Sequence, residues 1–307
     1  MNILVTGANG QLGQCLRDLV ERLDENDSSK WFWTDVNDIG RTVEHLDITD
    51  MSDVRSFIKR NEVDTIINCA AATNPDVLED NITLGRALNV EAPKNLAIVC
   101  KEFNAKLIHV STDYVFGDNI GIPRTEEDPT NPTSVYGKTK LEGEAMIKDS
   151  GCDYLIFRTA WLYSEHGNNF VKTMIKLMET KSDISVVSDQ VGTPTYARDL
   201  AEIIYNAAVF RRDAGGIYHF TNDGVCSWYD FTKAIEYLCR TSGKFQNLAW
   251  VNSISTEDFY NGKPHAVRPH YSVLSKEKLA RDFQHQYIPK HWFVSLITCV
   301  SNLLADK

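Results

Sequence analysis

The sequence has no long apolar run, no cluster of basic residues and no closely spaced pair of cysteines. No apolar segment reaches the ~18 residues that a membrane-spanning helix requires, and Met1 to Gly7 resembles a strand rather than a secretion signal. The 42 acidic residues outnumber the 32 basic ones, which gives a net charge of −10. We therefore expect neither a membrane protein nor a protein that binds nucleic acid.

The seven cysteines are scattered and include no C-x-x-C motif. An odd and dispersed set of cysteines is typical of reduced thiols, so the sequence predicts a cytoplasmic protein without disulfides. Internal repeats and low-complexity segments are also absent. A chain of 307 residues is long enough for one large α/β domain or for two lobes.

The N-terminal segment predicts a strand, a glycine-rich turn and a helix. The strand is expected over 2–6 and the helix through about residue 23, with Gly7, Gly10 and Gly13 between them. In a dinucleotide-binding turn, the first glycine permits a tight turn and the second lets the backbone approach a pyrophosphate. The third lets helix and strand pack closely, and the helix N-terminus attracts the anion.

A second predicted strand, 31–34, is followed by Asp35, about 20 residues beyond the glycines. An acid at this place binds the ribose hydroxyls of the adenosine, and its charge repels the 2′-phosphate of NADP(H). Asp35 therefore favours NADH, although Arg41 lies close enough in sequence to soften the preference. Asp38 is a weaker candidate for the same role.

Two further segments are candidates for the cofactor site. Asp47 is placed to bind the adenine amino group while Ile48 packs on the ring; alternatively, this stretch only leads to the cap of a helix near residue 53. A third predicted strand, 64–69, ends in small residues that include Ala71, Ala72 and Thr73. Small residues leave room for a flat ligand at the carboxyl end of the sheet.

A proton-transfer site is predicted around a fourth strand that begins at Lys106. Thr112 ends that strand, and Tyr136 and Lys140 follow four residues apart, on one face of a predicted helix. A lysine ammonium on the same face is expected to lower the pKa of the tyrosine. Thr112 could then share a substrate oxygen with Tyr136, which makes a general acid–base pair.

The alternation of strands and helices predicts a doubly wound, parallel α/β sheet of the Rossmann type. A long helix is expected over 82–103 and a fifth strand over 153–158. Residues 1–160 are predicted to form the dinucleotide-binding domain, to which segments of about 195–225 return. Residues 161–307 are predicted to form mainly a smaller substrate-binding lobe.

These motifs together resemble the extended short-chain dehydrogenase/reductase family. The family turn G-x-x-G-x-x-G is matched by the three glycines, and its pattern Y-x-E-x-D-x-x-x-P-x-x-x-Y-G-x-[ST]-K is matched at every position but the first, where Arg124 stands. The matching positions are Glu126, Asp128, Pro132, Tyr136, Gly137, Thr139 and Lys140.

Within this family the chain is similar to the dTDP-4-dehydrorhamnose reductases. The segments that carry this resemblance are 10–13, 111–116, 158–161, 189–195 and Arg268-Pro269. The resemblance implies that NADPH or NADH reduces the 4-keto group of dTDP-4-dehydro-6-deoxy-L-mannose to give dTDP-L-rhamnose.

The resemblance also implies roles for single residues. Tyr136 would donate the proton, Lys140 would lower its pKa and hold the nicotinamide ribose, and Thr112 would polarise the keto oxygen. Thr112, Asp113 and Trp161 would meet the sugar, and Arg268 is a candidate clamp for the diphosphate, because a guanidinium presents paired donors. The expected cofactor-lining residues are Gly7, Gly10, Gln11, Leu12, Gly13, Asp35, Asp47, Ile48, Ala71, Ala72, Thr73, Tyr136 and Lys140.

Some relatives dimerise through a magnesium site that uses a glutamate of the first helix. Cys15 stands at that place here, so we predict no metal, and any homodimer would form without one.

Two other functions remain open from the sequence. The first is a non-catalytic, dinucleotide-binding regulatory subunit similar to the beta subunit of methionine adenosyltransferase, although such a subunit need not keep Thr112, Tyr136 and Lys140. The second is a nucleotide-sugar epimerase or dehydratase, which would retain its NAD tightly instead of releasing it at each turnover.

Overall fold

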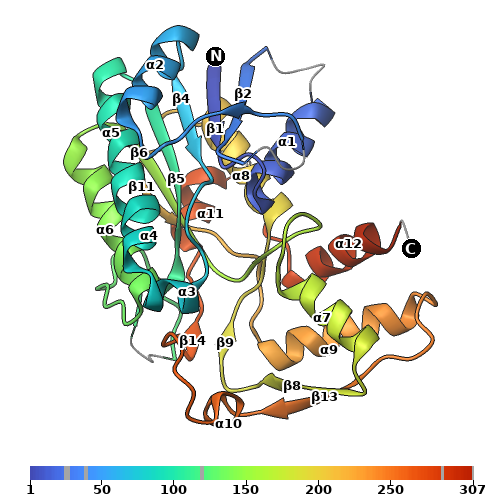
Figure 1. Ribbon diagram of the computed structural model, residues 1–307. Coiled ribbons are helices and arrows are strands. Elements are labelled where there is room, and N and C mark those ends of the chain that lie inside the picture. The colour runs from blue at the N-terminus through green and yellow to red at the C-terminus, as the bar shows by residue number, and fades with distance from the viewer. Residues whose placement is uncertain (24–27, 38–40, 118–120, 285–286, 306–307) are drawn as a thin grey trace.

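The computed structural model describes residues 1–23, 28–37, 41–117, 121–284 and 287–305. Its centre is a seven-stranded sheet with the order β11-β6-β5-β4-β1-β2-β3, in which every neighbouring pair is parallel (Figure 1). The predicted doubly wound parallel sheet is confirmed. The strands are β1 (Asn2–Thr6), β2 (Lys30–Asp35), β3 (Glu44–His45), β4 (Thr65–Asn68), β5 (Lys106–Thr112), β6 (Asp153–Thr159) and β11 (Gly216–His219).

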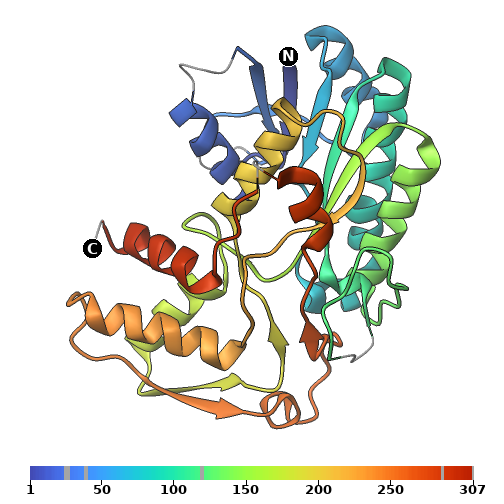
Figure 2. The same ribbon diagram turned by 180° about the vertical axis from the view of Figure 1, so that it is seen from behind.

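Helices cover both faces of this sheet, because its strands alternate apolar side chains between two cores. On β1, for example, Ile3 and Val5 belong to one core and Leu4 to the other. The first face carries α1 (Gln11–Leu23), α8 (Ala197–Val209) and α11 (Glu277–Phe283). The opposite face carries α2 (Met51–Asn61), α5 (Ala92–Phe103) and α6 (Val135–Ser150), and Figure 2 shows the molecule from behind.

The helical stretch that was predicted over 82–103 is divided. It consists of α4 (Ile82–Arg86), the π-helical segment η2 (Ala87–Glu91) and α5, and it follows a short helix, α3 (Pro75–Asp80). Pro93 has no backbone N–H for the carbonyl of Asn89, and the Ala92 N–H instead bonds the Ala87 carbonyl, five residues back. The chain is thus helical over the whole range that was predicted, with a π-helical segment inside it.

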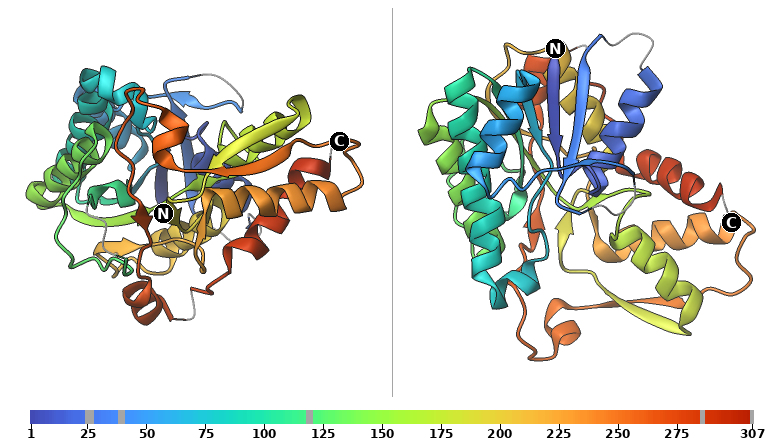
Figure 3. Two further views of the ribbon diagram at one scale, coloured as in Figure 1. Left: turned by 90° about the horizontal axis from the view of Figure 1, so that it is seen from below. Right: turned by 45° about the horizontal axis from the view of Figure 1, so that its top comes forward.

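The second lobe lies beyond the carboxyl ends of the sheet strands (Figures 1 and 3). Its core is formed by α7 (Phe170–Thr180), α9 (Trp228–Thr241) and α12 (Trp292–Ala305), packed with the parallel pair β8 (Asp183–Val187) and β13 (Trp250–Ile254). Small strands connect the lobes, and α10 follows β13. These elements are β7 (Leu162–Tyr163), β9 (Val191–Gly192), β10 (Thr195–Tyr196), β12 (Cys226–Ser227), β14 (Tyr271–Ser272) and α10 (Thr256–Tyr260).

Two segments beyond residue 160 return to the main sheet. α8 and β11 form the first, and α11 forms the second through the buried side chains of Leu279 and Phe283. The sequence did not predict the second return. We propose that the dinucleotide-binding unit comprises residues 1–160 together with these segments. Within the described ranges, no helix has both the length and the apolarity to cross a bilayer.

Candidate active site

The glycine turn is closed by contacts that exclude side chains. Gly7 has a φ of 68°, and a Cβ at this residue would lie 2.6 Å from the Ala70 nitrogen. A Cβ at Gly13 would lie 2.4 Å from the Gly7 oxygen, and one at Gly10 would lie 3.1 Å from it. The backbone of β1, the turn and α1 therefore approach one another as a dinucleotide-binding turn requires.

A cavity of about 380 Å³ opens beside this turn. Six of the predicted cofactor residues line it, so β1, β2 and β4 bring together segments that are far apart in sequence. The predicted residues in the lining are Gly7, Gly10, Asp35, Asp47, Ile48 and Ala71. The cavity is also lined by Thr6, Asn9, Val36, Asn37, Leu46, Cys69, Ala70 and Leu88.

The two acidic residues of the cavity are held by backbone groups. The Asp35 carboxylate accepts hydrogen bonds from the N–H groups of Asn9 and Asn37, each at 3.0 Å. Asp47 accepts from the N–H and hydroxyl of Thr49, and the next acid along the chain, Asp50, caps α2. Asp38, the weaker candidate, lies outside the described residues.

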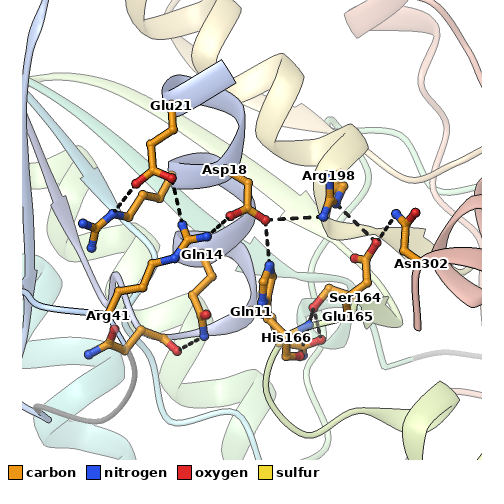
Figure 4. A network of polar contacts seen from close by, with 12 residues as sticks. Gln11, Gln14, Asp18, Glu21, Arg41, Ser164, Glu165, His166, Arg198 and Asn302 are labelled. Atoms are coloured by element: carbon orange, nitrogen blue, oxygen red, sulfur yellow. Dashed lines mark hydrogen bonds and ion pairs between the residues drawn. The ribbon is translucent and has the colours of Figure 1, made fainter. Parts of the chain in front are cut away.

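Arg41, which was expected to soften the preference of Asp35 for NADH, is engaged elsewhere. Its guanidinium pairs with Asp18 of α1 at 2.5 Å (Figure 4). The positive charge of Arg41 is therefore compensated by a carboxylate other than Asp35.

Gln11, Leu12 and Gly13 form the first turn of α1. Leu12 is buried, and the Gln11 side-chain oxygen accepts a hydrogen bond from the Ser164 hydroxyl at 3.0 Å. This contact belongs to a polar network between α1, α8 and the segment after β7, in which Asp18 binds His166 at 2.8 Å (Figure 4). The network links the glycine turn to the second lobe.

The face of α1 that carries Cys15 shows no metal-binding constellation. Cys15 is buried, and burial raises the pKa of its thiol. The described residues contain no group of three histidines, cysteines or acids that could hold a metal ion. None of the seven cysteines, all of which lie in the described ranges, forms a disulfide.

Ala72 is braced by a buried asparagine, and Thr73 follows it at the surface. The Asn89 side chain accepts from the Ala72 N–H and donates to the Ala72 carbonyl, both at 3.0 Å. Its amide also donates to the Thr139 hydroxyl at 3.3 Å. Asn89 thus ties the end of β4 to the helix that carries Tyr136.

The three predicted catalytic residues meet at the carboxyl end of β5. Thr112 ends this strand, and Tyr136 lies in the first turn of α6, whose N-cap Ser134 accepts from the Gly137 N–H at 3.1 Å. The Thr112 side chain makes a hydrogen bond with Tyr136 and another, at 2.8 Å, with Asp113. The Tyr136 ring packs edge-on against Tyr114, with 5.3 Å between the ring centroids.

The expected lowering of the tyrosine pKa is not found, so that prediction was wrong. Burial raises the pKa of Tyr136 above its usual value, and the hydrogen bond between Tyr136 and Thr112 offsets only part of this effect. The Lys140 amine is directed to the Val110 carbonyl at 2.7 Å and to the His109 ring at 3.2 Å. Tyr136 therefore keeps its proton at neutral pH, as an acid that protonates a substrate must.

Asp113 adjoins Thr112, and Trp161 lies two residues beyond Thr159, the partner of Thr112 in the neighbouring strand β6. The Trp161 indole stacks on Trp228 with 3.5 Å between centroids, and a Cβ at Gly192 would lie 2.8 Å from it. Trp161 also has a φ of 49°, which is rare for a residue with a side chain. Asp113 is buried, and its carboxylate accepts from Thr112 and Ser272; burial raises the pKa of this carboxyl to about 6.

Arg268 is held by an internal partner. Its guanidinium makes two hydrogen bonds, of 2.6 and 3.1 Å, to Asp76 at the start of α3, and it lies 5.5 Å from the centre of the Tyr260 ring. The same carboxylate accepts from the Ala266 N–H at 2.9 Å. Asp76 therefore fastens the loop that carries Arg268 across to the main sheet unit.

Two positions of the family pattern have structural roles. Glu126 accepts from the His219 N–H at 2.8 Å, and Asp128 accepts from the Thr125 N–H at 2.9 Å. The sequence analysis missed Asp76, Trp228, Asn68 and His109. Only His109 had a clear signal, because a histidine inside a buried apolar strand needs polar partners.

Comparison with known proteins agrees with this arrangement. The RmlD substrate binding domain family matches residues 1–304. The chain is 37% identical to the spore coat polysaccharide biosynthesis protein SpsK of Bacillus subtilis, over 94% of this chain and 93% of that one. It is 36% identical to a dTDP-4-dehydrorhamnose reductase of Aggregatibacter actinomycetemcomitans, over 94% and 95%.

Two solved structures share the fold over nearly the whole length. A dTDP-4-dehydrorhamnose reductase of Clostridium acetobutylicum has a TM-score of 0.87 at 39% identity, covering 99% of both chains. One from Bacillus anthracis, in complex with NADP, has a TM-score of 0.84 at 32% identity, covering 98% of this chain and 99% of that one. The protein therefore belongs to the RmlD substrate binding domain family, within the extended short-chain dehydrogenases/reductases.

Proposed function

We propose that the protein reduces the 4-keto group of dTDP-4-dehydro-6-deoxy-L-mannose (dTDP-4-dehydrorhamnose) to dTDP-L-rhamnose, with NADPH or NADH. The observation that carries this proposal is the pair of Thr112 and Tyr136 at the carboxyl end of the sheet, beside the glycine turn. A hydroxyl and a protonated phenol suit a carbonyl that becomes an alcohol. Membership of the family, with reductases among the relatives, supports the choice of substrate.

The chain's own residues would handle the proton. Tyr136 donates its phenolic proton to the oxygen at C4, and the Thr112 hydroxyl shares that oxygen. Lys140 holds the nicotinamide ribose. The bound nicotinamide supplies the hydride.

The described residues fit a dinucleotide. A Cβ at Gly7, Gly10 or Gly13 would come close to nearby backbone atoms, so only glycine keeps this turn compact. The first turn of α1 has backbone N–H groups that can bind a pyrophosphate. Asp35 lies in the adjoining cavity, where it would bind the adenosine ribose. The second lobe would hold the sugar nucleotide through Asp113, Trp161 and Arg268.

The choice between NADH and NADPH tests Asp35. Asp35→Ala removes a carboxylate that would repel a 2′-phosphate, so kcat/KM for NADPH should rise relative to that for NADH. The ratio is measured by steady-state kinetics with both cofactors. The exposed Asp53, in the first turn of α2, provides the control Asp53→Ala, which should leave the ratio unchanged. An unmoved ratio in Asp35→Ala would assign the preference to another residue.

The proposed binding of the diphosphate by Arg268 is tested by comparing substitutions at Arg268 and at its ion-pair partner, Asp76. Arg268→Lys keeps the charge but loses the paired donors, so we expect a higher KM for the sugar nucleotide and an unchanged Kd for NAD(P)H. Asp76→Asn loosens the same loop but leaves the guanidinium free for a diphosphate. It should not raise the KM as Arg268→Lys does. Equal KM values for both variants would mean that Arg268 only fastens the loop.

The proposed reaction has a direct test. Purified protein is mixed with NADPH or NADH and a panel of 4-keto-6-deoxy nucleotide sugars, and the absorbance of the reduced nicotinamide is followed. Oxidation with dTDP-4-dehydrorhamnose, with dTDP better than UDP, is the expected result, and NMR identifies the product. An epimerase would interconvert sugars without net cofactor oxidation. Inactivity on every sugar, together with tight binding of a partner enzyme, would replace the proposal with the regulatory role.

We also propose that the protein works in the cytoplasm, which suits seven mostly buried cysteines that form no disulfide among the described residues. A homodimer remains a prediction, to be measured by analytical ultracentrifugation. Because Cys15 stands where some relatives have a glutamate, a dimer should persist when divalent metal is removed with EDTA.

A further inference from the structure

A buried chain of polar side chains runs from the glycine turn to the catalytic helix. It links Thr6 of β1, Asn68 of β4, His109 of β5 and Lys140 of α6, and each of these residues is at most 2% exposed. The contacts are 2.8 Å from Thr6 to Asn68, 3.1 Å from Asn68 to His109 and 3.2 Å from His109 to Lys140. Since a buried polar group must find a partner, the direction of each hydrogen bond can be deduced.

The orientation of the Asn68 amide is fixed by a backbone group. Its oxygen accepts a hydrogen bond from the Ala70 N–H at 3.1 Å, and an N–H can only donate. The other end of the amide is an NH₂ group, and this end faces Nδ1 of His109. Nδ1 must therefore accept, which leaves the proton of the neutral imidazole on Nε2.

A charged imidazolium does not fit this position. A proton on Nδ1 would meet the Asn68 NH₂ group, donor against donor. Burial, together with the neighbouring Lys140, keeps the pKa of His109 well below its usual value. His109 therefore presents an N–H donor, never a lone pair, to the Lys140 amine.

A protonated Lys140 has only N–H donors, and the Nε2–H of His109 that faces it is also a donor. The two groups therefore cannot form a hydrogen bond while Lys140 is an ammonium. Of the two contacts described for this amine, only the Val110 carbonyl accepts. A neutral amine matches both contacts, because its lone pair accepts from Nε2–H while one of its N–H groups donates to Val110. Burial acts in the same direction and lowers the pKa of Lys140 to about 8, although Glu144 opposes it.

We infer that His109, oriented by Asn68, is a positioning residue that offers Lys140 a hydrogen-bond donor and so holds the amine ready to release its proton. This inference rests on the proposed function. After Tyr136 has given its proton to the substrate, one proton of the Lys140 ammonium can restore the phenol; because the amine points to Val110 and His109, this proton would pass through a bridging water. A phenol and a neutral amine result, His109 stabilises the amine, and water returns one proton to it.

Among the groups around Lys140, we single out His109 because a change at Asn68 can move its proton from one ring nitrogen to the other. Glu144, one turn along α6, is bound by Arg158 of β6 and by Ser111 of β5. Several charged groups of the other elements packed on α6 have partners of their own. These are Glu79 of α3, which binds the Val135 N–H, Arg86 of α4, paired with Glu142, Glu91 of η2, paired with Lys94, and Asp113 of η3 (Asp113–Val115), bound to Thr112 and Ser272.

Asn68→Asp tests the inference with an isosteric change. A carboxylate would accept from Nδ1–H and move the imidazole proton from Nε2 to Nδ1, so that Nε2 accepts from a Lys140 ammonium. If activity requires protonated Lys140, the pH profile of kcat should fall near pH 8 in the unmodified protein. The fall should move upward by about one pH unit in Asn68→Asp. Asn81→Asp adds the same charge at the exposed N-cap of α4 and should leave the profile in place.

A second readout does not depend on activity. In the ¹⁵N-labelled full-length protein, the imidazole shifts distinguish a proton on Nε2 from one on Nδ1, and His109 is assigned by its absence from the spectrum of His109→Gln. We expect Nε2–H in the unmodified protein and Nδ1–H in Asn68→Asp. A proton on Nδ1 in the unmodified protein, or an unmoved kcat profile in a folded Asn68→Asp, would overturn the inference. If no sugar is reduced at all, the spectrum still decides the tautomer, so the two failures are distinguishable.

Discussion

Tyr136→Phe should lower kcat by roughly 10² to 10⁴ and leave the Kd for NAD(P)H nearly unchanged. The substitution removes the phenolic proton while keeping a ring that still packs against Tyr114. Because the pKa of Tyr136 is raised, the unmodified residue is protonated at neutral pH and available as the acid. Single-turnover kinetics of cofactor oxidation separate this effect from product release.

The neighbouring ring provides a matched control for this result. Tyr114→Phe makes the same change on the other ring of this edge-on pair, but the hydrogen bond to Thr112 is made by the side chain of Tyr136. Its effect on kcat should be far smaller. A Tyr136→Phe enzyme that retained most of its activity, or two variants with equal losses, would remove Tyr136 from the role of acid.

Glu144→Ala should lower the free energy of unfolding by about 3–5 kcal/mol, because it leaves a buried guanidinium without its counter-charge. Glu144 and Arg158 are fully buried and form two hydrogen bonds of 2.9 and 2.7 Å between α6 and β6. The Ser111 hydroxyl donates to the same carboxylate at 2.6 Å. Urea unfolding, followed by circular dichroism without cofactor, measures the change.

The same helix offers an exposed pair that is also joined by two hydrogen bonds. Glu142 binds Arg86 through two hydrogen bonds of 2.8 and 2.7 Å, but the side chains are 37% and 48% exposed. Glu142→Ala should therefore cost only about 0–1 kcal/mol. A double change of Glu144→Leu and Arg158→Met should recover much of the loss, since it removes both buried charges. Equal costs for Glu144→Ala and Glu142→Ala would contradict this account.

Local patterns carried the prediction of the cofactor turn and of the catalytic pair. A strand followed by Gly7, Gly10 and Gly13 needs only neighbouring residues to be recognised, and the spacing of Tyr136 and Lys140 follows from one helical turn. The parallel sheet followed from the alternation of strands and helices, which is also a local signal. These features depend on residues close together in the chain, so the sequence could specify them.

Side-chain pairing across elements could not be deduced in this way. Asp76 and Arg268 are 192 residues apart, and nothing near either one indicates the other. The direction of the Lys140 amine, toward His109 and Val110 rather than Tyr136, likewise depends on how β5 packs under α6. For this reason the predicted sign of the Tyr136 pKa shift was wrong: its cause is burial, which only the packed structure defines.

By itself, then, the sequence determined the parallel α/β sheet and the glycine turn and indicated the proposed catalytic residues, because each leaves a short periodic or spaced pattern. The tertiary structure alone decided which charges are buried in pairs, which segments return to the sheet and how Asn68 orients His109. The physical reason is that hydrogen bonding and desolvation act through space. Their partners come from strands and helices that meet only when the chain has folded.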